Sequence, residues 1–423
     1  MVLLVEYSPN DIEELSKQAV DELQALNPEW QQALDLRKEP FRIDREGSST
    51  TVVPQGVCGQ LEVGNQTVEV VPKYLANRDD VPADWRENFL TILAFSGVSE
   101  FHIEFAETIH GGASASSLMD IMAAAYADRL STALAQGVPA DYTEREERLS
   151  NARGRLSTRK LYPQLLKKPS ELWYRTTVYT TDIPLSRILK WACHRFSELA
   201  TATQTVNRLY ELEQRFPNIE PADVSGLRPS QVSLSSQHRR FDESLTIAKW
   251  LLDNLEAAYA GEDVALPGIL FKTEEMYEGF VDAVLDAVDV PWEYTGKDAE
   301  TYKRLASGQP HQNINPDHLF RSDEACILVL DSKYTKMGSG TDVHGDKPER
   351  NYFYQVLAYG RGYEADAVGL VYPRLRTQKR CWELETAGTP STVHVFEIDP
   401  MKFLADQDAF FQSVQKRLVR VVA

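Results

Sequence analysis

The sequence places two aspartates and a lysine close together. These are residue types that can support metal-dependent hydrolysis of a phosphodiester. Pro316-Asp317 precedes a polar turn, and an apolar run then leads to Asp331 and Lys333. Side chains alternate along a strand, so Asp331 and Lys333 share one face, and a hairpin would fold Asp317 back beside them. Two carboxylates can bind Mg²⁺, which activates a phosphate and a water, and a lysine can stabilise the charge that develops.

The residues before Asp331 favour a buried strand over an exposed one. D-x-K alone is a common pattern, and a surface hairpin with charged residues at its end would contain it too. The run Ile327–Leu330 is continuously apolar, however, which is typical of a strand buried on both faces. We therefore expect Asp331 and Lys333 at the end of a strand in a sheet, where sites commonly form.

Two predicted helices flank this strand in the sequence. The segment 273–288 reads as a helix that carries Glu278. The segment 350–363 reads as a second helix, in which Gln355 and Tyr359 are four residues apart and so lie on one face. Ordinary packing would explain the Gln355 and Tyr359 spacing equally well.

This order of motifs resembles the PD-(D/E)xK nuclease superfamily, and within it the McrC family, the nuclease subunits of McrBC-type modification-dependent restriction systems. The motifs that carry the resemblance are Tyr277-Glu278-Gly279-Phe280, Pro316-Asp317, Asp331-Ser332-Lys333-Tyr334, Tyr354-Gln355 with Ala358-Tyr359, and Gly369–Pro373. The resemblance spans most of the chain and is most specific in the last third.

The resemblance implies roles for six residues. Asp317 and Asp331 would bind Mg²⁺ (or Mn²⁺), and Glu278 would help to hold or orient the metal. Lys333 would stabilise the attacking hydroxide or the developing charge. The helpers that position the substrate or the lysine would be Gln355 and Tyr359.

The resemblance also implies a partner, a hexameric McrB-like AAA+ GTPase. The N-terminal half would dock in the central channel of that hexamer and stimulate its GTPase. Double-stranded DNA, probed for modified bases by the partner, would be the substrate. Arg153-Gly154-Arg155-Leu156 and the phrase that ends in Pro72-Lys73 resemble family phrases in this half.

The net charge indicates that, if the chain cuts DNA, either a local basic groove or a partner must hold the substrate. The chain has a formal net charge of −18, so taken whole it would be repelled by DNA, whereas a self-sufficient DNA binder usually has a basic footprint. No G-x-x-x-x-G-K-[ST] motif occurs in the sequence, so we expect no NTP hydrolysis by this chain. A protein that never meets nucleic acid would also fit this charge.

Length and composition predict a soluble, multidomain, cytoplasmic protein. A chain of 423 residues is too long to fold around a single hydrophobic core of ordinary size. A content of 43% hydrophobic and 26% charged residues is typical of globular proteins. No apolar stretch is long enough to cross a membrane, and the start of the chain does not read as a signal peptide. Four scattered cysteines follow no metal-binding spacing and favour a reducing compartment.

We predict an α+β multidomain fold in three parts. Residues 1–160 form a β-rich N-terminal domain that engages the partner through a charged arm. Residues 161–263 form a helical linker domain. Residues 264–423 form an α/β nuclease domain of the PD-(D/E)xK, restriction-endonuclease-like type.

Local patterns give further expectations. Ser8 is a possible cap for a helix from about Pro9, and Gly64-Asn65 indicates a hairpin. We favour a solvated lysine at Lys73 and a solvated helix or arm over residues 142–160. His318 should point to the strand face opposite Asp317 and serve a structural role. A possible phosphate-contacting rim comprises Lys347, Arg350, Arg374, Arg376, Lys379 and Arg380.

Two other functions stay open from the sequence. A stand-alone exonuclease of the RecB-like type shares the Q-x-x-x-Y feature, although the acidity and the large N-terminal half speak against it. A regulatory subunit that only stimulates a partner NTPase would keep the acidic cluster without using it. Cleavage assays on the pure chain and on an Asp331 variant separate these functions.

Overall fold

The computed structural model describes the chain apart from residues 12–14, 47–48, 77–80, 97–116, 158–170, 218, 220–231, 233, 259–267, 297–314, 324, 336–348, 375–380, 384–391 and 423. Contacts divide the chain into two compact units. The first joins Met1–Ala106 to Ala258–Ala423, and the second is Glu107–Ala257. The expected mixed α and β architecture is confirmed, while the three functional ranges stay a prediction.

The first unit begins with a four-stranded sheet whose last strand comes from far along the chain. Its order is β1 (Val2–Val5), β6 (Gln66–Val71), β5 (Val57–Val63) and β10 (Gly268–Lys272). The predicted hairpin between β5 and β6 is confirmed, and its turn residues Gly64 and Asn65 have φ of +55° and +59°. β10 runs antiparallel to β5, so the predicted nuclease range begins with a strand of the N-terminal sheet.

A second sheet and a long helix complete this N-terminal part. The sheet order is β2 (Asn10–Asp11), β4 (Ser49–Pro54) and β3 (Phe41–Glu46), and the helix is α1 (Lys17–Ala33). The prediction of a helix from Pro9 capped by Ser8 is wrong. The Asn10 side chain bonds to backbone atoms of Val5, Ser8 and Val52, which holds this segment as a strand. The α1 helix is instead capped by Ser16, whose hydroxyl accepts from the Ala19 N–H at 3.1 Å.

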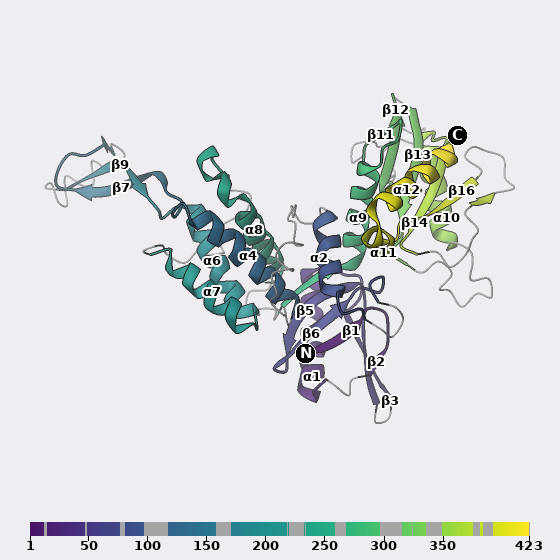
Figure 1. The fold of residues 1–423 in the computed structure, drawn as a ribbon, viewed down its shortest axis with the longest axis horizontal. Helices are drawn as coiled ribbons and strands as arrows, with labels where there is room; N and C mark the ends of the chain where they lie inside the picture. The colour runs from purple at the N-terminus through teal and green to yellow at the C-terminus, as the bar shows by residue number, and fades with distance from the viewer. Residues whose placement is uncertain are drawn as a thin grey trace, which may run out of the picture. The chain divides into compact units, whose positions relative to one another are not determined.

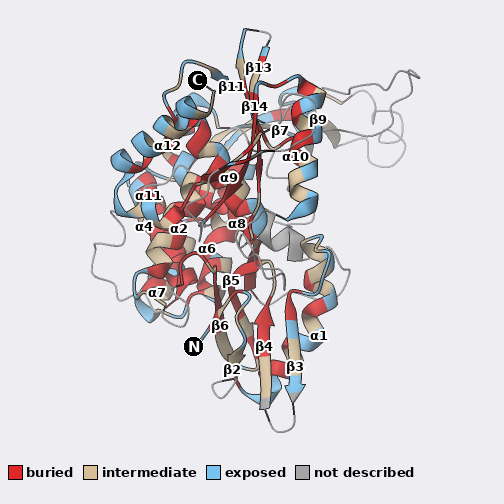
Figure 2. Ribbon diagram, turned by 90° about the vertical axis from the view of Figure 1, so that its right-hand side faces the viewer, coloured by how far each residue is buried: buried red, intermediate tan, exposed pale blue. Residues whose placement is uncertain are grey.

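The C-terminal part of the first unit is built on a six-stranded mixed sheet (Figure 1). The strand order is β11 (Glu293–Tyr294), β12 (His318–Ser322), β13 (Ala325–Ser332), β14 (Ala367–Tyr372), β16 (Thr392–Glu397) and β15 (Cys381–Glu383). β13, β14 and β16 are parallel, and the other pairs are antiparallel. The central strands are buried along most of their length, as the continuous apolar runs predict (Figure 2).

The helices of this part are α9 (Thr273–Ala287), α10 (Arg350–Tyr363), α11 (Pro400–Ala405) and α12 (Gln407–Val422). α10 connects β13 to the parallel strand β14, and its Val356 and Leu357 share a core cluster with Val329 of β13. Because side chains alternate along a strand, Asp331 and Lys333 point to the same face as Val329, the face that α10 covers. α2 (Trp85–Phe95) packs on α9 through Phe95 and Phe280, whose ring centroids are 5.8 Å apart.

The second unit combines helices with a narrow β-ribbon. Its helices are α4 (Leu118–Leu134), α6 (Pro184–Leu199), α7 (Thr203–Gln214), the 3-10 helix η5 (Ser236–Phe241) and α8 (Asp242–Ala258). The ribbon consists of β7 (Asp141–Leu149), β9 (Leu172–Thr180) and β8 (Arg155–Leu156), and it extends away from the helices of its own unit (Figure 1). Of the solvated helix or arm expected over residues 142–160, the helix is wrong, because residues 141–149 and 155–156 pair across strands with β9, whereas this largely exposed ribbon is compatible with an arm.

Within the described part of the chain, no helix has the length and apolar character needed to span a membrane.

Candidate active site

The β12–β13 hairpin places Asp317 beside Asp331. His318 pairs with Leu330 and Leu319 with Val329, so Asp317 stands opposite Asp331 one position further along the ladder. The Ser332 N–H donates to Asp317 Oδ2 at 2.8 Å, which fixes the carboxylate at the end of β13. The predicted hairpin is thus confirmed, and the two carboxylates lie at the same end of the sheet.

Lys333 completes a buried cluster of charges with Asp331. Lys333 Nζ lies 2.5 Å from Asp331 Oδ2, and the two side chains are 14% and 2% exposed. The Lys333 N–H donates to the Val371 carbonyl at 2.8 Å, so the backbone here remains attached to β14 after β13 has ended. The predicted neighbourhood of Asp331 and Lys333 on one strand face is confirmed by this contact.

Burial and mutual repulsion dominate the electrostatics of this cluster. Burial raises the pKa of Asp317 to about 6, and the charges of Asp331 and Glu278 add to the shift. Burial also raises the pKa of Asp331, which the Lys333 ammonium counteracts only in part. Burial alone would lower the pKa of Lys333, but the Asp331 carboxylate outweighs it and the net shift is upward. Carboxylates held together at this cost are typical of functional sites.

Helices α9 and α10 bring the other predicted residues toward the hairpin. Glu278 on α9 is half-buried and close enough to raise the pKa of both aspartates. On α10, Gln355 Nε2 donates to the Tyr359 hydroxyl at 2.7 Å, which confirms that the two share a face. The Tyr359 hydroxyl also feels the charges of Asp331 and Lys333, so this face of α10 borders the carboxylates.

Tyr352 is a neighbour of the lysine that the sequence analysis did not find. Lys333 Nζ lies 4.8 Å from the centroid of the Tyr352 ring, within the range of a cation–π contact. Tyr352 precedes Gln355 by three residues and Tyr359 by seven, so helical spacing places all three on one face. That spacing was the signal available in the sequence.

The opposite face of β13 carries a series of hydrogen-bonded polar side chains. His318 Nε2 and the Ser332 hydroxyl are 2.7 Å apart, and His318 Nδ1 lies 2.7 Å from the Tyr294 hydroxyl. The Tyr294 hydroxyl in turn donates to Asp282 on α9. The expected structural placement of His318, away from Asp317, is confirmed. This chain of contacts holds Ser332, whose N–H positions Asp317.

The chemistry of these side chains fits a divalent cation. Carboxylate oxygens are the ligands that Mg²⁺ prefers. Asp331 Oδ2 is buried against the Lys333 ammonium, so a cation bound by this carboxylate would share it with the lysine. Among the residues that the structure describes, no group of three or more His, Cys, Asp or Glu side chains is arranged as a complete metal site. Asp317 and Asp331 therefore form a pair, with Glu278 further away.

The basic residues near the motif are only partly described. Arg374 Nε lies 3.4 Å from Asp399 Oδ2, so it pairs with the residue that caps α11. Arg350 lies over the ring of Tyr354 on the exposed surface of α10. The other members of the predicted rim, at 347, 376, 379 and 380, lie outside the described residues.

Lys73 does not stand in solvent as expected. Its Nζ donates to the Tyr334 carbonyl at 2.9 Å and lies 3.7 Å from the centroid of the Tyr334 ring. The prediction of a solvated lysine is wrong, because the residue after the D-x-K motif packs against the N-terminal sheet.

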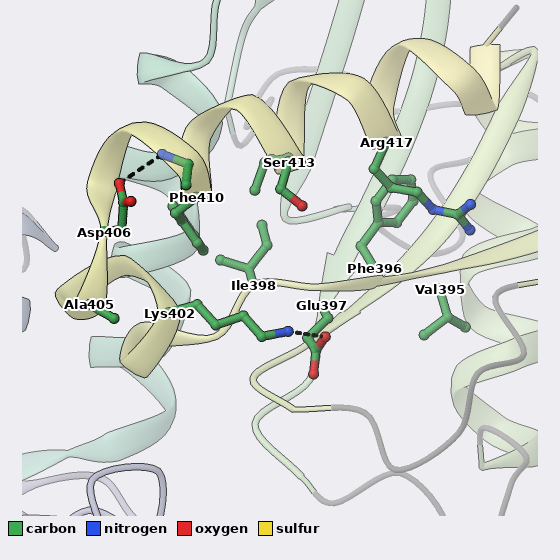
Figure 3. A pocket seen from close by; sticks show the side chains of 12 residues that line it. Val395, Phe396, Glu397, Ile398, Lys402, Ala405, Asp406, Phe410, Ser413 and Arg417 are labelled. Atoms are coloured by element: carbon green, nitrogen blue, oxygen red, sulfur yellow. Dashed lines mark hydrogen bonds and ion pairs between the residues drawn. The ribbon is translucent and has the colours of Figure 1, made fainter.

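A cavity of about 490 Å³ lies elsewhere, between β16 and the helices α11 and α12 (Figure 3). Lys402 bridges to Glu397 at its rim, and Phe396 and Phe410 line it. None of the six predicted site residues lines this cavity, so it belongs to the packing of the C-terminal helices.

Fold and site together define a mixed α/β protein that presents a carboxylate pair and a lysine at one end of a central sheet. The chain belongs to the family described as McrBC 5-methylcytosine restriction system component, whose sequence model matches residues 52–373. The resemblance to a component of McrBC-type restriction systems is thereby confirmed. No curated protein matches the chain.

Two solved structures are similar to the chain. One is a refined half-complex from a tetradecameric assembly of Thermococcus gammatolerans McrB AAA+ hexamers with bound McrC, with a TM-score of 0.70 and 17% identity over 99% of both chains. The other is the cryo-EM structure of the Thermococcus gammatolerans McrBC complex, with a TM-score of 0.50 and 16% identity over 68% of this chain and 87% of that chain. At such low identity the likeness shows the fold alone.

Proposed function

We propose that the chain is the DNA endonuclease subunit of a McrBC-type restriction system, with a PD-(D/E)xK nuclease domain. The observation that carries the proposal is the opposition of Asp317 and Asp331 in the β12–β13 hairpin, with Lys333 Nζ 2.5 Å from Asp331 Oδ2. Membership of the McrBC family supports the same assignment. The substrate is double-stranded DNA, and the modified base is selected by the partner.

The roles of the side chains follow from their charges and positions. Asp317 and Asp331 hold the metal, with Glu278 contributing from α9. When bound, Mg²⁺ or Mn²⁺ supplies Lewis-acid activation of the phosphodiester and of the attacking water. Lys333 sits beside the metal-binding carboxylate and offsets negative charge that develops during attack. Its position is held by Asp331, by the Val371 carbonyl and by the Tyr352 ring.

Gln355 and Tyr359 act as helpers from α10. Their hydrogen bond at 2.7 Å holds the phenol ring at the border of the carboxylate pair. A phenol in that place can position either the scissile phosphate or the lysine. Both side chains are neutral, so they are poor ligands for a divalent cation and are proposed to shape the site instead of binding the ion.

The partner is an AAA+ GTPase of the McrB type. One of the similar solved structures contains McrB AAA+ hexamers with bound McrC, and the net charge of −18 favours a chain that receives DNA from another subunit. The second unit offers a protruding ribbon with exposed Tyr142 and Tyr179 side chains, which suits contact with another protein. We therefore assign partner engagement and GTPase stimulation to parts outside the six-stranded sheet.

Replacing Asp331 by alanine tests the proposal. With the partner, GTP, Mg²⁺ and modified DNA present, the variant should lose cleavage while it still stimulates GTP hydrolysis. Removal of one metal-binding carboxylate from the first unit leaves the ribbon of the second unit unchanged in sequence, so the two activities should separate. Plasmid linearisation and phosphate release measure them in the same reaction.

The alternatives give different results in that assay. Unchanged cleavage by Asp331→Ala would reject the site. Vigorous cleavage by the pure wild-type chain without partner would favour a stand-alone exonuclease. Partner stimulation without cleavage by the wild-type complex would favour a purely regulatory subunit.

A further inference from the structure

A buried carboxylate of the N-terminal sheet lies at the junction with the candidate nuclease site. Glu6 follows β1, and its N–H donates to the Val71 carbonyl at 3.0 Å. The residue is 1% exposed, so its charge is almost fully removed from water. A buried carboxylate is costly unless several donors surround it, so its partners need a physical explanation.

Both oxygens of Glu6 accept hydrogen bonds from the C-terminal part. The Thr273 hydroxyl donates to Oε1 at 2.5 Å, and the Tyr334 hydroxyl donates to Oε2 at 2.5 Å. The Lys73 N–H adds a longer bond to Oε2 at 3.3 Å. Burial raises the pKa of Glu6, while the Lys73 charge and these hydrogen bonds act in the opposite direction.

These two hydroxyl donors belong to the elements that carry the candidate site. Thr273 is the first residue of α9, and Glu278 lies five positions further along that helix. Tyr334 directly follows Lys333. The Tyr334 ring also packs on Tyr277, the neighbour of Glu278, at a centroid distance of 5.6 Å. One side chain of the N-terminal sheet therefore contacts both carriers of site residues.

Lys73 strengthens the same junction from the end of β6. Its ammonium donates to the Tyr334 carbonyl at 2.9 Å and covers the Tyr334 ring at 3.7 Å. It also lies 4.7 Å from the centroid of the Tyr7 ring. Tyr334 is thus held at its hydroxyl by Glu6 and at its carbonyl and ring by Lys73. The chain direction just after Lys333 is fixed by residues of the N-terminal sheet.

We propose that Glu6 and Lys73 are positioning residues through which the N-terminal sheet sets the geometry of the nuclease site. The hydrogen bonds described above act on Tyr334 and Thr273, which neighbour the proposed site residues in the chain. This inference rests on the proposed nuclease function. Its consequence is that a movement of the N-terminal sheet alters the placement of Lys333 and Glu278 together.

Glu6→Gln tests the inference, with Glu69→Gln as the matched control. Glu69 is equally buried in the same sheet, but its carboxylate pairs with Arg86 of α2. Glutamine keeps the size of Glu6 and removes the charge opposite Lys73. Lys73→Met is a second variant that removes the ammonium and preserves the packed stem.

The first measurement is amide hydrogen exchange of the full chain without partner or DNA. Glu6→Gln and Lys73→Met should speed exchange at Lys333, at Tyr334 and in the first turn of α9. Glu69→Gln should leave these amides as in the wild type. Equal exchange in the Glu6 and Glu69 variants would overturn the inference, whatever the chain cleaves.

The second measurement is Mn²⁺ binding to the full chain by calorimetry. Loss of a residue bonded directly to a metal ligand typically weakens metal affinity by about 10- to 100-fold; because Glu6 acts on the ligands through Thr273 and Tyr334, we expect the low end, about tenfold, in Glu6→Gln. Cleavage with the partner should fall by a similar factor while GTPase stimulation is retained. The double variant Glu6→Gln/Lys73→Met should be no worse than the stronger single variant, because both act through Tyr334.

The outcomes separate the inference from the proposed function. If Asp331→Ala abolishes Mn²⁺ binding and cleavage while Glu6→Gln retains both, the positioning role is wrong and the nuclease stands. If Asp331→Ala also retains both, the nuclease site itself is wrong.

Discussion

At the residue scale, the candidate site holds like charges together at an energetic cost. Asp317, Asp331 and Glu278 repel one another in a poorly hydrated place, and Lys333 compensates only part of that repulsion. A divalent cation would remove the cost, because it interacts favourably with every carboxylate at once. The site should therefore be less stable without metal than with it.

A first prediction concerns Asp317 without metal. Its pKa in the folded chain is raised to about 6, so the folded state takes up a proton at higher pH than the unfolded chain does. Ionised Asp317 therefore costs stability above about pH 6, and that cost disappears below about pH 4, where both states are protonated. Asp317→Asn in EDTA should raise the free energy of unfolding by about 1–3 kcal/mol near pH 8.

Urea unfolding at several pH values measures this effect. The gain should shrink as the pH falls and vanish near about pH 4. Asp366→Asn is the control: it makes the same substitution at an exposed position before β14, so it measures the effect of replacing an aspartate outside the site. A gain that is independent of pH, or one that matches the control, would contradict the electrostatic explanation. With Mg²⁺ added, the wild type should have a higher free energy of unfolding than Asp317→Asn, which reverses the order expected in EDTA.

At the element scale, the site depends on strands and helices that originate far apart in the chain. β12 and β13 are local neighbours, but α9 reaches the carboxylates only after β10 has crossed to the N-terminal sheet. That crossing requires close backbone approach. A Cβ on Gly268 would lie 2.4 Å from the Gln60 carbonyl oxygen, and its φ is +140°. No side chain fits there without moving a strand.

The second prediction follows from this contact. Gly268→Ala should destabilise the chain by about 2–4 kcal/mol, because backbone strain and a clash with a carbonyl add together. Gly137→Ala is the matched control, since its φ of +100° imposes similar strain while nothing lies within 4 Å of the added Cβ. The control should cost about 1–2 kcal/mol. Denaturant unfolding measures both losses. If the two variants lose equal free energy of unfolding, the close contact between β5 and β10 does not add to the cost of the substitution at Gly268.

At the scale of the whole molecule, net charge bears on how the proposed DNA substrate would be bound. A chain with a net charge of −18 repels a polyanion at long range, and the repulsion grows as salt is removed. The carboxylate pair lies in one compact unit and the ribbon of β7, β8 and β9 lies in the other. Under the proposed function, such a subunit would depend on a partner to bring DNA to the carboxylates.

The third prediction is strict dependence on that partner. The pure chain with Mg²⁺ should cleave plasmid DNA at less than about a hundredth of the rate of the complex, which corresponds to about 2.7 kcal/mol in activation free energy. Lowering the salt should not rescue the pure chain, because the repulsion becomes less screened. Gel assays over a salt series measure both effects. Rescue at low salt would mean that a local basic groove suffices.

The sequence by itself determined the local features of the site. The apolar run before Asp331, the D-x-K spacing and the turn between two strands are read over short distances, so the β12–β13 hairpin and the shared face of Asp331 and Lys333 were predictable. Local reading wrongly started a helix near Pro9 and kept a helix as one alternative from residue 142, whereas residues 10–11 and 141–149 pair with strands from elsewhere in the chain.

Only the tertiary structure decided which distant residues meet the site. Tyr334 and Glu6 are separated by 328 positions, and Thr273 and Glu6 by 267, yet each pair shares a hydrogen bond in the buried junction. Periodicity carries no signal for such contacts, because it reports which face of an element is buried and not what buries it. The identity of the covering element is fixed by packing and by the need to satisfy each buried polar group.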